Sequence, residues 1–284
     1  MHAADCNDGV PHGAGTAPEA GLTAMLSDLD LARGAALAGS AVALKHFAAL
    51  ADLPREVKPD GSVVTEADRE TEAAIRDLLT RERPADALLG EEGGAAGEGR
   101  RRWIVDPIDG TAQFVAGDDR WLVLVALEED GDIVAAAAAE PAQGTLWWAS
   151  RGGGAFRSTL DGTAEERVTV ATDRPDVLDG ARLGVVPAPP NYLESDRLIA
   201  APLAARATTA EWDVHAPLLV ACGGLDLAVQ TRGQIWDFAA TSLIVTEAGG
   251  AYGGVDGIRG PRAGTSLFAR SPALWEEARR ALWP

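Results

Sequence analysis

The hydrophobic and polar positions near the start of the chain predict an α-helix. Ser27 and Asp28 are both candidate N-caps, and the helix must end before Pro54. Between these limits, apolar residues recur at helical spacing and form a single stripe. The stripe consists of Leu31, Ala35, Ala38 and Val42.

A polar hairpin and a second helix are predicted next. The hairpin covers residues 55–65, with a Pro-Asp-Gly turn at residues 59–61. The second helix begins at Thr65, and Asp68 three residues later completes a capping-box pattern. Its apolar positions are Ala74, Ile75, Leu78 and Leu79. Asp68 therefore has a structural role open to it, beside any chemical role.

Short apolar runs predict strands in the middle of the chain. These runs cover residues 87–90, 103–105, 121–127, 133–139 and 145–149. The last three runs have the form of a meander, with Glu-Asp-Gly at 129–131 as a hairpin turn. The Arg-Gly-Gly-Gly segment at 151–154 is interpreted as another turn, because the lysine and the following helix of a phosphate-binding P-loop are missing.

The second half of the chain has a less regular pattern. Helices are predicted over residues 191–202, in a run from near Asp213 through Cys222, and over residues 236–248. Gly249-Gly250 closes the last of these helices, and residues 225–229 are predicted as a strand. Residues 1–20 are rich in Gly, Ala, Pro and Asp without periodicity, so we expect them to be disordered.

Length, charge and cysteine count narrow the possible functions. The 284 residues can form one large or two closely packed domains. A net charge of −18 disfavours binding to nucleic acid and to anionic membranes. Two cysteines imply no disulfide framework, and neither a signal peptide nor a membrane-spanning run is recognised, so we expect a cytoplasmic protein.

The segment from Asp106 to Thr111 carries the clearest chemical signal. Asp106 and Asp109 lie three residues apart, directly after the strand predicted over residues 103–105. Such neighbouring carboxylates repel each other, and a hard divalent cation such as Mg²⁺ relieves the repulsion. Glu91-Glu92 at another strand end and Asp237 at a helix start are further acidic candidates. Taken alone, Glu91-Glu92 fits a solvated loop better than a site, and Asp237 fits a favourable interaction with the helix dipole better than a site.

In this order the motifs resemble those of the inositol monophosphatase superfamily, whose members are metal-dependent phosphomonoesterases. The similarity extends from about residue 28 to residue 272, and its motifs are Lys58 with Val64–Asp68, Gly90–Glu92, Trp103–Thr111, and Trp236–Ala240 with Glu247–Gly250. The resemblance implies an α/β fold, a layered αβαβα sandwich. It also implies that residues 21–284 form a catalytic domain of two closely packed α/β halves, and that the protein is a Mg²⁺-dependent homodimer acting on a small phosphorylated metabolite.

The resemblance also implies a role for each matching residue. Metal would be bound by Glu91, Asp106, Asp109, Asp237 and the backbone carbonyl of Ile108. Asp68 and Thr111 would orient the attacking water, with Glu91 completing the catalytic group. The amides of Gly110 and Thr111 would face the phosphate from a helix N-terminus, next to Asp109.

Within the superfamily the chain is most similar to the histidinol-phosphate phosphatases of bacteria. Members often carry a substrate-contacting glutamate seven residues before the last metal-binding aspartate, and this chain has Gln230 there. Asp118, Asp119 or Asp213 could supply the missing acid, and Asp213 is a candidate substrate contact or, equally, a helix cap. The alternatives are an inositol monophosphatase and a homologue that binds a phosphate ligand without turnover.

Overall fold

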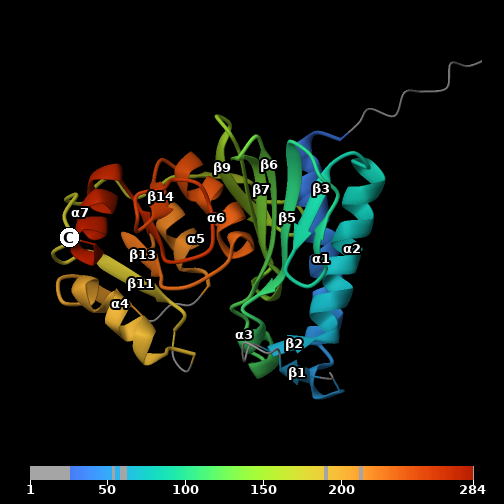
Figure 1. Ribbon diagram of the computed structural model, residues 1–284, viewed down its shortest axis with the longest axis horizontal. Helices are drawn as coiled ribbons and strands as arrows, with labels where there is room; N and C mark the ends of the chain where they lie inside the picture. Colours follow the sequence, from blue (N-terminus) through green and yellow to red (C-terminus); the bar gives the residue numbers. More distant parts are fainter. Residues whose placement is uncertain (1–25, 53–54, 58–62, 189–190, 211–213, 284) are drawn as a thin grey trace, which may run out of the picture.

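The computed structural model describes residues 26–52, 55–57, 63–188, 191–210 and 214–283 (Figure 1). The segment 1–20, expected to be disordered, lies outside these residues, as do Asp213 and the turn at 59–61. None of the helices in the described ranges combines the length and the apolar character needed to cross a membrane.

Five layers follow one another across the molecule (Figure 1). The outer helices α1 (Asp28–Phe47) and α2 (Glu66–Glu82) cover one face of a large sheet. Helices α5 (Ala216–Ala221) and α6 (Ile235–Glu247) lie between this sheet and a smaller one. Helices α4 (Glu194–Ala204) and α7 (Pro272–Leu282) cover the far side of the smaller sheet. This order is the αβαβα sandwich that the family resemblance implied, and the expectation is confirmed.

The described residues contribute eight strands to the large sheet, in the order β10-β9-β8-β7-β6-β5-β3-β4. In chain order they are β3 (Ala87–Gly90), β4 (Gly94–Ala96), β5 (Arg101–Asp109), β6 (Leu122–Glu129), β7 (Asp132–Glu140), β8 (Thr145–Ser150), β9 (Gly154–Thr159) and β10 (Glu166–Val168). Strands β3 and β5 run parallel, and every other neighbouring pair in this sheet is antiparallel. The meander over β6, β7 and β8 is therefore confirmed.

The smaller sheet has the order β12-β11-β13-β15-β14 among the described residues. Its strands are β11 (Arg182–Val186), β12 (Thr208–Ala210), β13 (Leu227–Gln230), β14 (Ala251–Gly254) and β15 (Ser266–Ala269). A separate hairpin of β1 (Arg55–Val57) and β2 (Val63–Thr65) precedes α2, as predicted. The short helices are α3 (Thr111–Ala116) and two 3₁₀ turns, Leu50–Asp52 and Pro141–Gln143.

The central strands are apolar on both faces because a hydrophobic core lies on each side of the large sheet. In β6, Leu122, Leu124 and Ala126 pack into the core beneath α5 and α6. The alternate residues of β6, from Val123 to Leu127, pack into the core beneath α1 and α2. The resulting continuous apolar run is what identified this segment as a buried strand.

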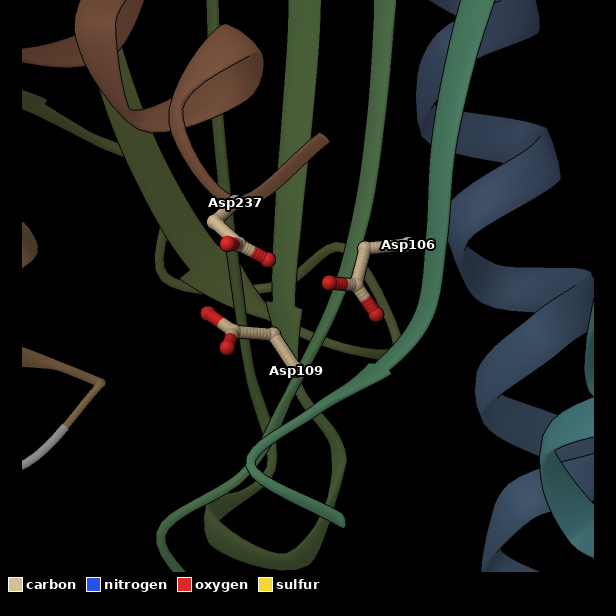
Figure 2. A group of neighbouring side chains, drawn as sticks. All are labelled: Asp106, Asp109 and Asp237. Atoms are coloured by element: carbon tan, nitrogen blue, oxygen red, sulfur yellow. The ribbon is translucent and has the colours of Figure 1, made fainter. Parts of the chain in front are cut away.

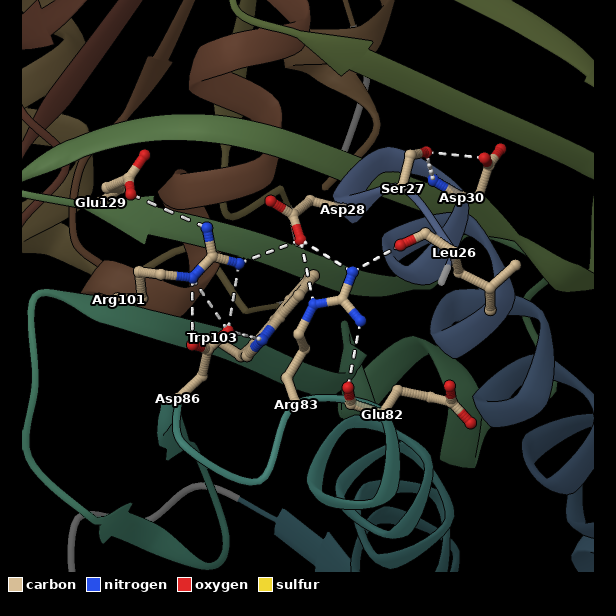
Figure 3. Close-up of polar contacts among 10 residues, drawn as sticks. All are labelled: Leu26, Ser27, Asp28, Asp30, Glu82, Arg83, Asp86, Arg101, Trp103 and Glu129. Atoms are coloured by element: carbon tan, nitrogen blue, oxygen red, sulfur yellow. Dashed lines mark hydrogen bonds and ion pairs between the residues drawn. The ribbon is translucent and has the colours of Figure 1, made fainter. Parts of the chain in front are cut away.

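An ion-pair network joins α1, α2 and the start of β5 at the end of the strand opposite Asp106 (Figure 3). Asp28 Oδ1 accepts Arg83 Nη2 at 3.2 Å and Arg101 Nη2 at 2.9 Å. Arg101 Nε donates to Asp86 Oδ1 at 3.0 Å, and Trp103 Nε1 donates to Asp86 Oδ2 at 3.0 Å. This network fixes where both outer helices sit relative to β5, the strand that carries Asp106.

Several predicted boundaries were wrong. The strand predicted over 103–105 extends to Asp109, with a register shift against β6 between Asp106 and Asp109. The helix predicted over 191–202 begins at Glu194, and the described part of the helix predicted from near Asp213 begins at Ala216. The strand predicted over 225–229 begins at Leu227, since the Leu225 amide still donates to the Leu219 carbonyl of α5.

Candidate active site

The parallel pairing of β3 and β5 brings Glu91 beside Asp106. Gly90 lies opposite Val105 in the register, and the Glu91 amide donates to the Val105 carbonyl at 3.2 Å. Strands β3 and β5 therefore each place a carboxylate at the same edge of the sheet, where sites of α/β proteins are commonly built. The irregular pairing after Asp106 then turns the chain so that Asp109 follows on the same side (Figure 2).

Asp237 joins this group from the first turn of α6 (Figure 2). Its Oδ2 accepts the Gln234 amide at 2.6 Å, so it caps the helix as well. One carboxylate oxygen from each of Asp106, Asp109 and Asp237 lies within 4.8 Å of the others. The structure thus brings together three of the predicted metal ligands, with Glu91 adjacent.

The electrostatics of this group favour a bound cation. Asp106 is only 1% exposed. Burial raises the pKa of Asp106 well above its ordinary value of 3.8, and repulsion from Glu91, Asp109 and Asp237 raises it further. The donor set consists of carboxylate oxygens, which suits a hard divalent cation. The residues present therefore fit a metal ion.

Asp68 forms the predicted capping box and also contacts Thr111. Its Oδ2 accepts the Thr65 amide at 2.7 Å and the Thr65 hydroxyl at 2.6 Å, which is the capping box. Its Oδ1 accepts the Thr111 hydroxyl at 3.1 Å. Thr111 Oγ1 also lies 3.1 Å from the Ile108 carbonyl oxygen, so its single proton serves one acceptor at a time. Burial raises the pKa of Asp68, and the hydrogen bonds from Thr65 and Thr111 partly offset this effect.

The turn from Asp109 to Thr111 depends on glycine at position 110. Gly110 has φ +92°, which strains any residue with a side chain, and it directly precedes α3. A Cβ at this position would lie 3.2 Å from the Arg120 carbonyl oxygen and 3.4 Å from Val214 Cγ2. The chain on either side of α3 and the segment beginning at Val214 therefore border the predicted phosphate site.

The predicted substrate-binding residues lie only partly within the described ranges. Asp213 lies outside the described residues, although its neighbour Val214 packs beside Gly110. Gln230 is buried at the end of β13, seven residues before Asp237. Asp118 is paired with Arg120, whose hydrogen bonds hold the pKa of Asp118 below its ordinary value.

The sequence missed two features near the site. Glu72, one helical turn beyond Asp68, is buried and binds the loop that carries Glu91. Its spacing of four residues from Asp68 was the available signal. His215 is buried with Nε2 3.6 Å from Glu140 Oε1. Burial lowers the pKa of His215 to about 4 and raises the pKa of Glu140.

The Gly-rich segment at 151–154 is a turn between β8 and β9, as predicted. Its amides are directed at a carboxylate of the protein itself: Gly152 and Gly154 donate to the Glu247 side chain at 2.7 and 2.8 Å. These contacts tie the hairpin to the last turn of α6.

Comparison with known proteins identifies the class of protein to which this fold and site belong. Residues 26–282 match the inositol monophosphatase family. The chain belongs to this family and is a phosphoric monoester hydrolase.

Its sequence relatives further support the histidinol-phosphatase branch. A histidinol-phosphatase of Mycobacterium tuberculosis is 40% identical over 85% of this chain and 94% of its own length. One from Streptomyces coelicolor is 39% identical over 85% of this chain and 91% of its own length. Among solved structures, the extragenic suppressor protein SuhB of Bartonella henselae is similar with a TM-score of 0.76 and 26% identity, covering 89% of this chain and 97% of that one.

Proposed function

We propose that the protein is a Mg²⁺-dependent phosphatase that hydrolyses histidinol phosphate. The observation that carries the proposal is the convergence of Asp106, Asp109 and Asp237 beside Glu91, next to the Thr111–Asp68 hydrogen bond. A phosphate monoester needs its charge neutralised and a water activated, and both requirements are met by cations held on carboxylates.

The carboxylates of Glu91, Asp106, Asp109 and Asp237 would hold the metal, with the Ile108 carbonyl as a further oxygen ligand. Bound Mg²⁺ would supply Lewis-acid stabilisation of the phosphoryl oxygens and lower the pKa of a coordinated water. The protein's own contribution is to fix these oxygens on two strand ends and one helix start, which limits their motion.

Asp68 and Thr111 would align the attacking water. The Thr111 hydroxyl donates to Asp68 Oδ1, so its oxygen lone pairs remain open to a hydrogen bond from water. When the Ile108 carbonyl is engaged in metal binding, Asp68 is the remaining acceptor for the Thr111 proton. The amides of Gly110 and Thr111, at the start of α3, would receive the phosphate oxygens.

The substrate assignment rests on the histidinol-phosphatase relatives and on charge. Histidinol phosphate carries an amine and an imidazole, so acidic groups beside the phosphate site would recognise it. Since Asp118 is neutralised by Arg120, Asp119 and Asp213 are the proposed recognition acids. Gln230 stands where a glutamate is frequent in the family, and we assign it a neutral, hydrogen-bonding contact.

The test is a comparison of kcat/KM for phosphate release across a panel of phosphomonoesters with Mg²⁺ present. The proposal expects histidinol phosphate to be preferred over inositol monophosphate and over a simple aryl phosphate. A preference for inositol monophosphate would replace the substrate assignment. Absence of turnover with every member of the panel would favour a protein that only binds a phosphate ligand.

A further inference from the structure

We propose that Glu72 is a positioning residue that holds Glu91 in place for metal binding. This inference rests on the proposed function, in which Glu91 is a metal ligand. Glu72 lies on α2 and does not belong to the acidic group around Asp106. It acts instead on the backbone that directly follows Glu91.

Both carboxylate oxygens of Glu72 are used to bind this backbone. Oε2 accepts the Glu92 amide at 2.7 Å, and Oε1 accepts the Gly93 amide at 2.8 Å. On the other side of Glu91, its own amide donates to the Val105 carbonyl at 3.2 Å. The backbone is therefore bound to β5 at the Glu91 amide and to α2 at the two amides that follow.

Arg76 completes the contact on the next turn of α2. Its Nε donates to Glu72 Oε1 at 2.6 Å, and its Nη2 donates to the carbonyl oxygen of Gly94. The Glu72 side chain is only 2% exposed, so this charge is compensated by Arg76 and two amides rather than by water. A buried carboxylate with three donors has little freedom to move, which makes it a firm support for the loop.

The loop approaches Glu72 so closely that only glycine fits. A Cβ at Gly90 would lie 2.3 Å from Glu72 Oε1, and a Cβ at Gly93 would lie 2.6 Å from the same atom. The glycine before Glu91-Glu92 and the glycine after it are thus both explained by Glu72. Displacing this carboxylate would therefore move the segment between them.

Helix α2 consequently connects two parts of the proposed site. Asp68 and Glu72 are four residues apart and lie on one face of the helix, and both are buried. Asp68 binds Thr111, and Glu72 binds the segment after Glu91. One rigid helix therefore sets the distance between the water-aligning pair and this metal ligand.

The test measures Mg²⁺ binding directly by titration calorimetry, beside the kinetics. In Glu72→Gln, one oxygen and the charge that Arg76 requires are lost. We expect the Mg²⁺ dissociation constant to rise about 10- to 100-fold, as is typical when a group that orients a ligand is removed. At saturating Mg²⁺, KM for the phosphomonoester should stay within about twofold of the wild-type value. Glu70→Gln, an exposed carboxylate on the same helix, is the matched control and should bind Mg²⁺ like the wild type.

Gly93→Ala provides a second route that leaves every charge in place. Its Cβ would displace the Glu72 carboxylate, so Mg²⁺ binding should again weaken. Gly99→Ala is its control, since a Cβ there meets only ordinary contacts at 3.7 Å. If Glu72→Gln does not fold, Gly93→Ala decides the question.

A folded Glu72→Gln with a Mg²⁺ dissociation constant within about twofold of the wild type would overturn the inference, because the predicted change is at least about tenfold. In that case the proposed function would stand. If the wild-type protein itself shows neither Mg²⁺ binding nor phosphate release, the proposed function fails, and the role of Glu72 fails with it.

Discussion

Replacing Asp106 by asparagine should stabilise the metal-free protein while removing its response to Mg²⁺. Asp106 is 1% exposed and lies beside three other carboxylates. Asparagine has nearly the same shape but no charge, so the substitution removes the repulsion and the burial of the charge together. The same change removes a proposed metal ligand, and stability and metal binding should therefore move in opposite directions.

The expected size follows from the geometry. Two unit charges no more than 4.8 Å apart repel by at least about 3.5 kcal/mol at an effective dielectric constant of about 20. The total destabilisation from the Asp106 charge at pH 7 is limited to about 4 kcal/mol, because the carboxyl, with an ordinary pKa of 3.8, can bind a proton instead of remaining charged. We expect a gain of about 1 to 4 kcal/mol in the unfolding free energy, or about 2 to 8 °C in Tm.

The stability difference between Asp106→Asn and the wild type should depend on pH. The folded-state pKa of Asp106 is raised, so its destabilising effect is absent below the unfolded value of 3.8 and grows as the pH rises towards the folded-state pKa. The advantage of Asp106→Asn should therefore be largest near neutral pH and should vanish towards about pH 4. Denaturant unfolding in the presence of a chelator measures this difference.

Adding Mg²⁺ should then narrow this difference in stability, and should reverse it where the gain of Asp106→Asn is smaller than the gain from Mg²⁺ binding. At a concentration about 100 times its dissociation constant, Mg²⁺ stabilises a protein by about 2.7 kcal/mol, and only the wild type should gain this. Asp132→Asn is the control, because that carboxylate is exposed and pairs with Arg151 at 3.1 Å. A metal-free Asp106→Asn less stable than the wild type, or one stabilised equally by Mg²⁺, would refute the reasoning.

Three further predictions address other parts of the structure. Thr111→Val should lower kcat roughly 10²- to 10⁴-fold with little effect on stability, while Thr111→Ser retains turnover because it keeps the hydroxyl bonded to Asp68; equal loss in both variants would count against this role. Burial lowers the pKa of His215 to about 4 from 6.5, so the wild type should lose stability as the pH falls through this interval. His215→Gln lacks this group, so its unfolding free energy, measured by urea unfolding, should fall by roughly 3 kcal/mol less. Parallel losses in the two proteins would show that His215 does not titrate in this way. Asp28→Ala should reduce the unfolding free energy by about 1 to 2 kcal/mol without changing kcat, because Asp28 joins arginines from two elements, whereas the exposed Asp77→Ala should change neither.

The first half of the chain could be predicted well because each element carries its own local signal. Ser27 caps α1 by accepting the Asp30 amide, and Thr65 with Asp68 forms the capping box of α2. The continuous apolar run of β6 reflects cores on both sides of the sheet. In each case the pattern that predicts the element is also the pattern that stabilises it.

The smaller sheet and the last helix were largely missed. Strands β11, β14 and β15 are short. β11 pairs with β13 far along the chain, and β14 pairs with the next strand, β15, across a long irregular loop rather than a tight hairpin turn, so no local pattern identifies them. For α7 a local signal existed: Ser271 accepts the Leu274 amide and Pro272 occupies the first turn.

The candidate site divides in the same way. Asp106 and Asp109 could be found because they lie only three residues apart, directly after the apolar run of β5. The role proposed for Glu72 could not, because its partners are the backbone amides of Glu92 and Gly93, 20 and 21 residues later. Backbone N–H donors of this kind leave no signature in residue type, and only the folded structure shows which carboxylate accepts from them.

The central claim is that the carboxylate group around Asp106 binds a metal ion that the hydrolysis requires. It is tested most directly by phosphate release from histidinol phosphate, measured while Mg²⁺ is titrated into chelator-treated protein. The account predicts no release without metal, saturable activation by Mg²⁺ and no activation in Asp106→Asn. Undiminished release in the chelator-treated wild type, or release by Asp106→Asn at the wild-type rate, would contradict it.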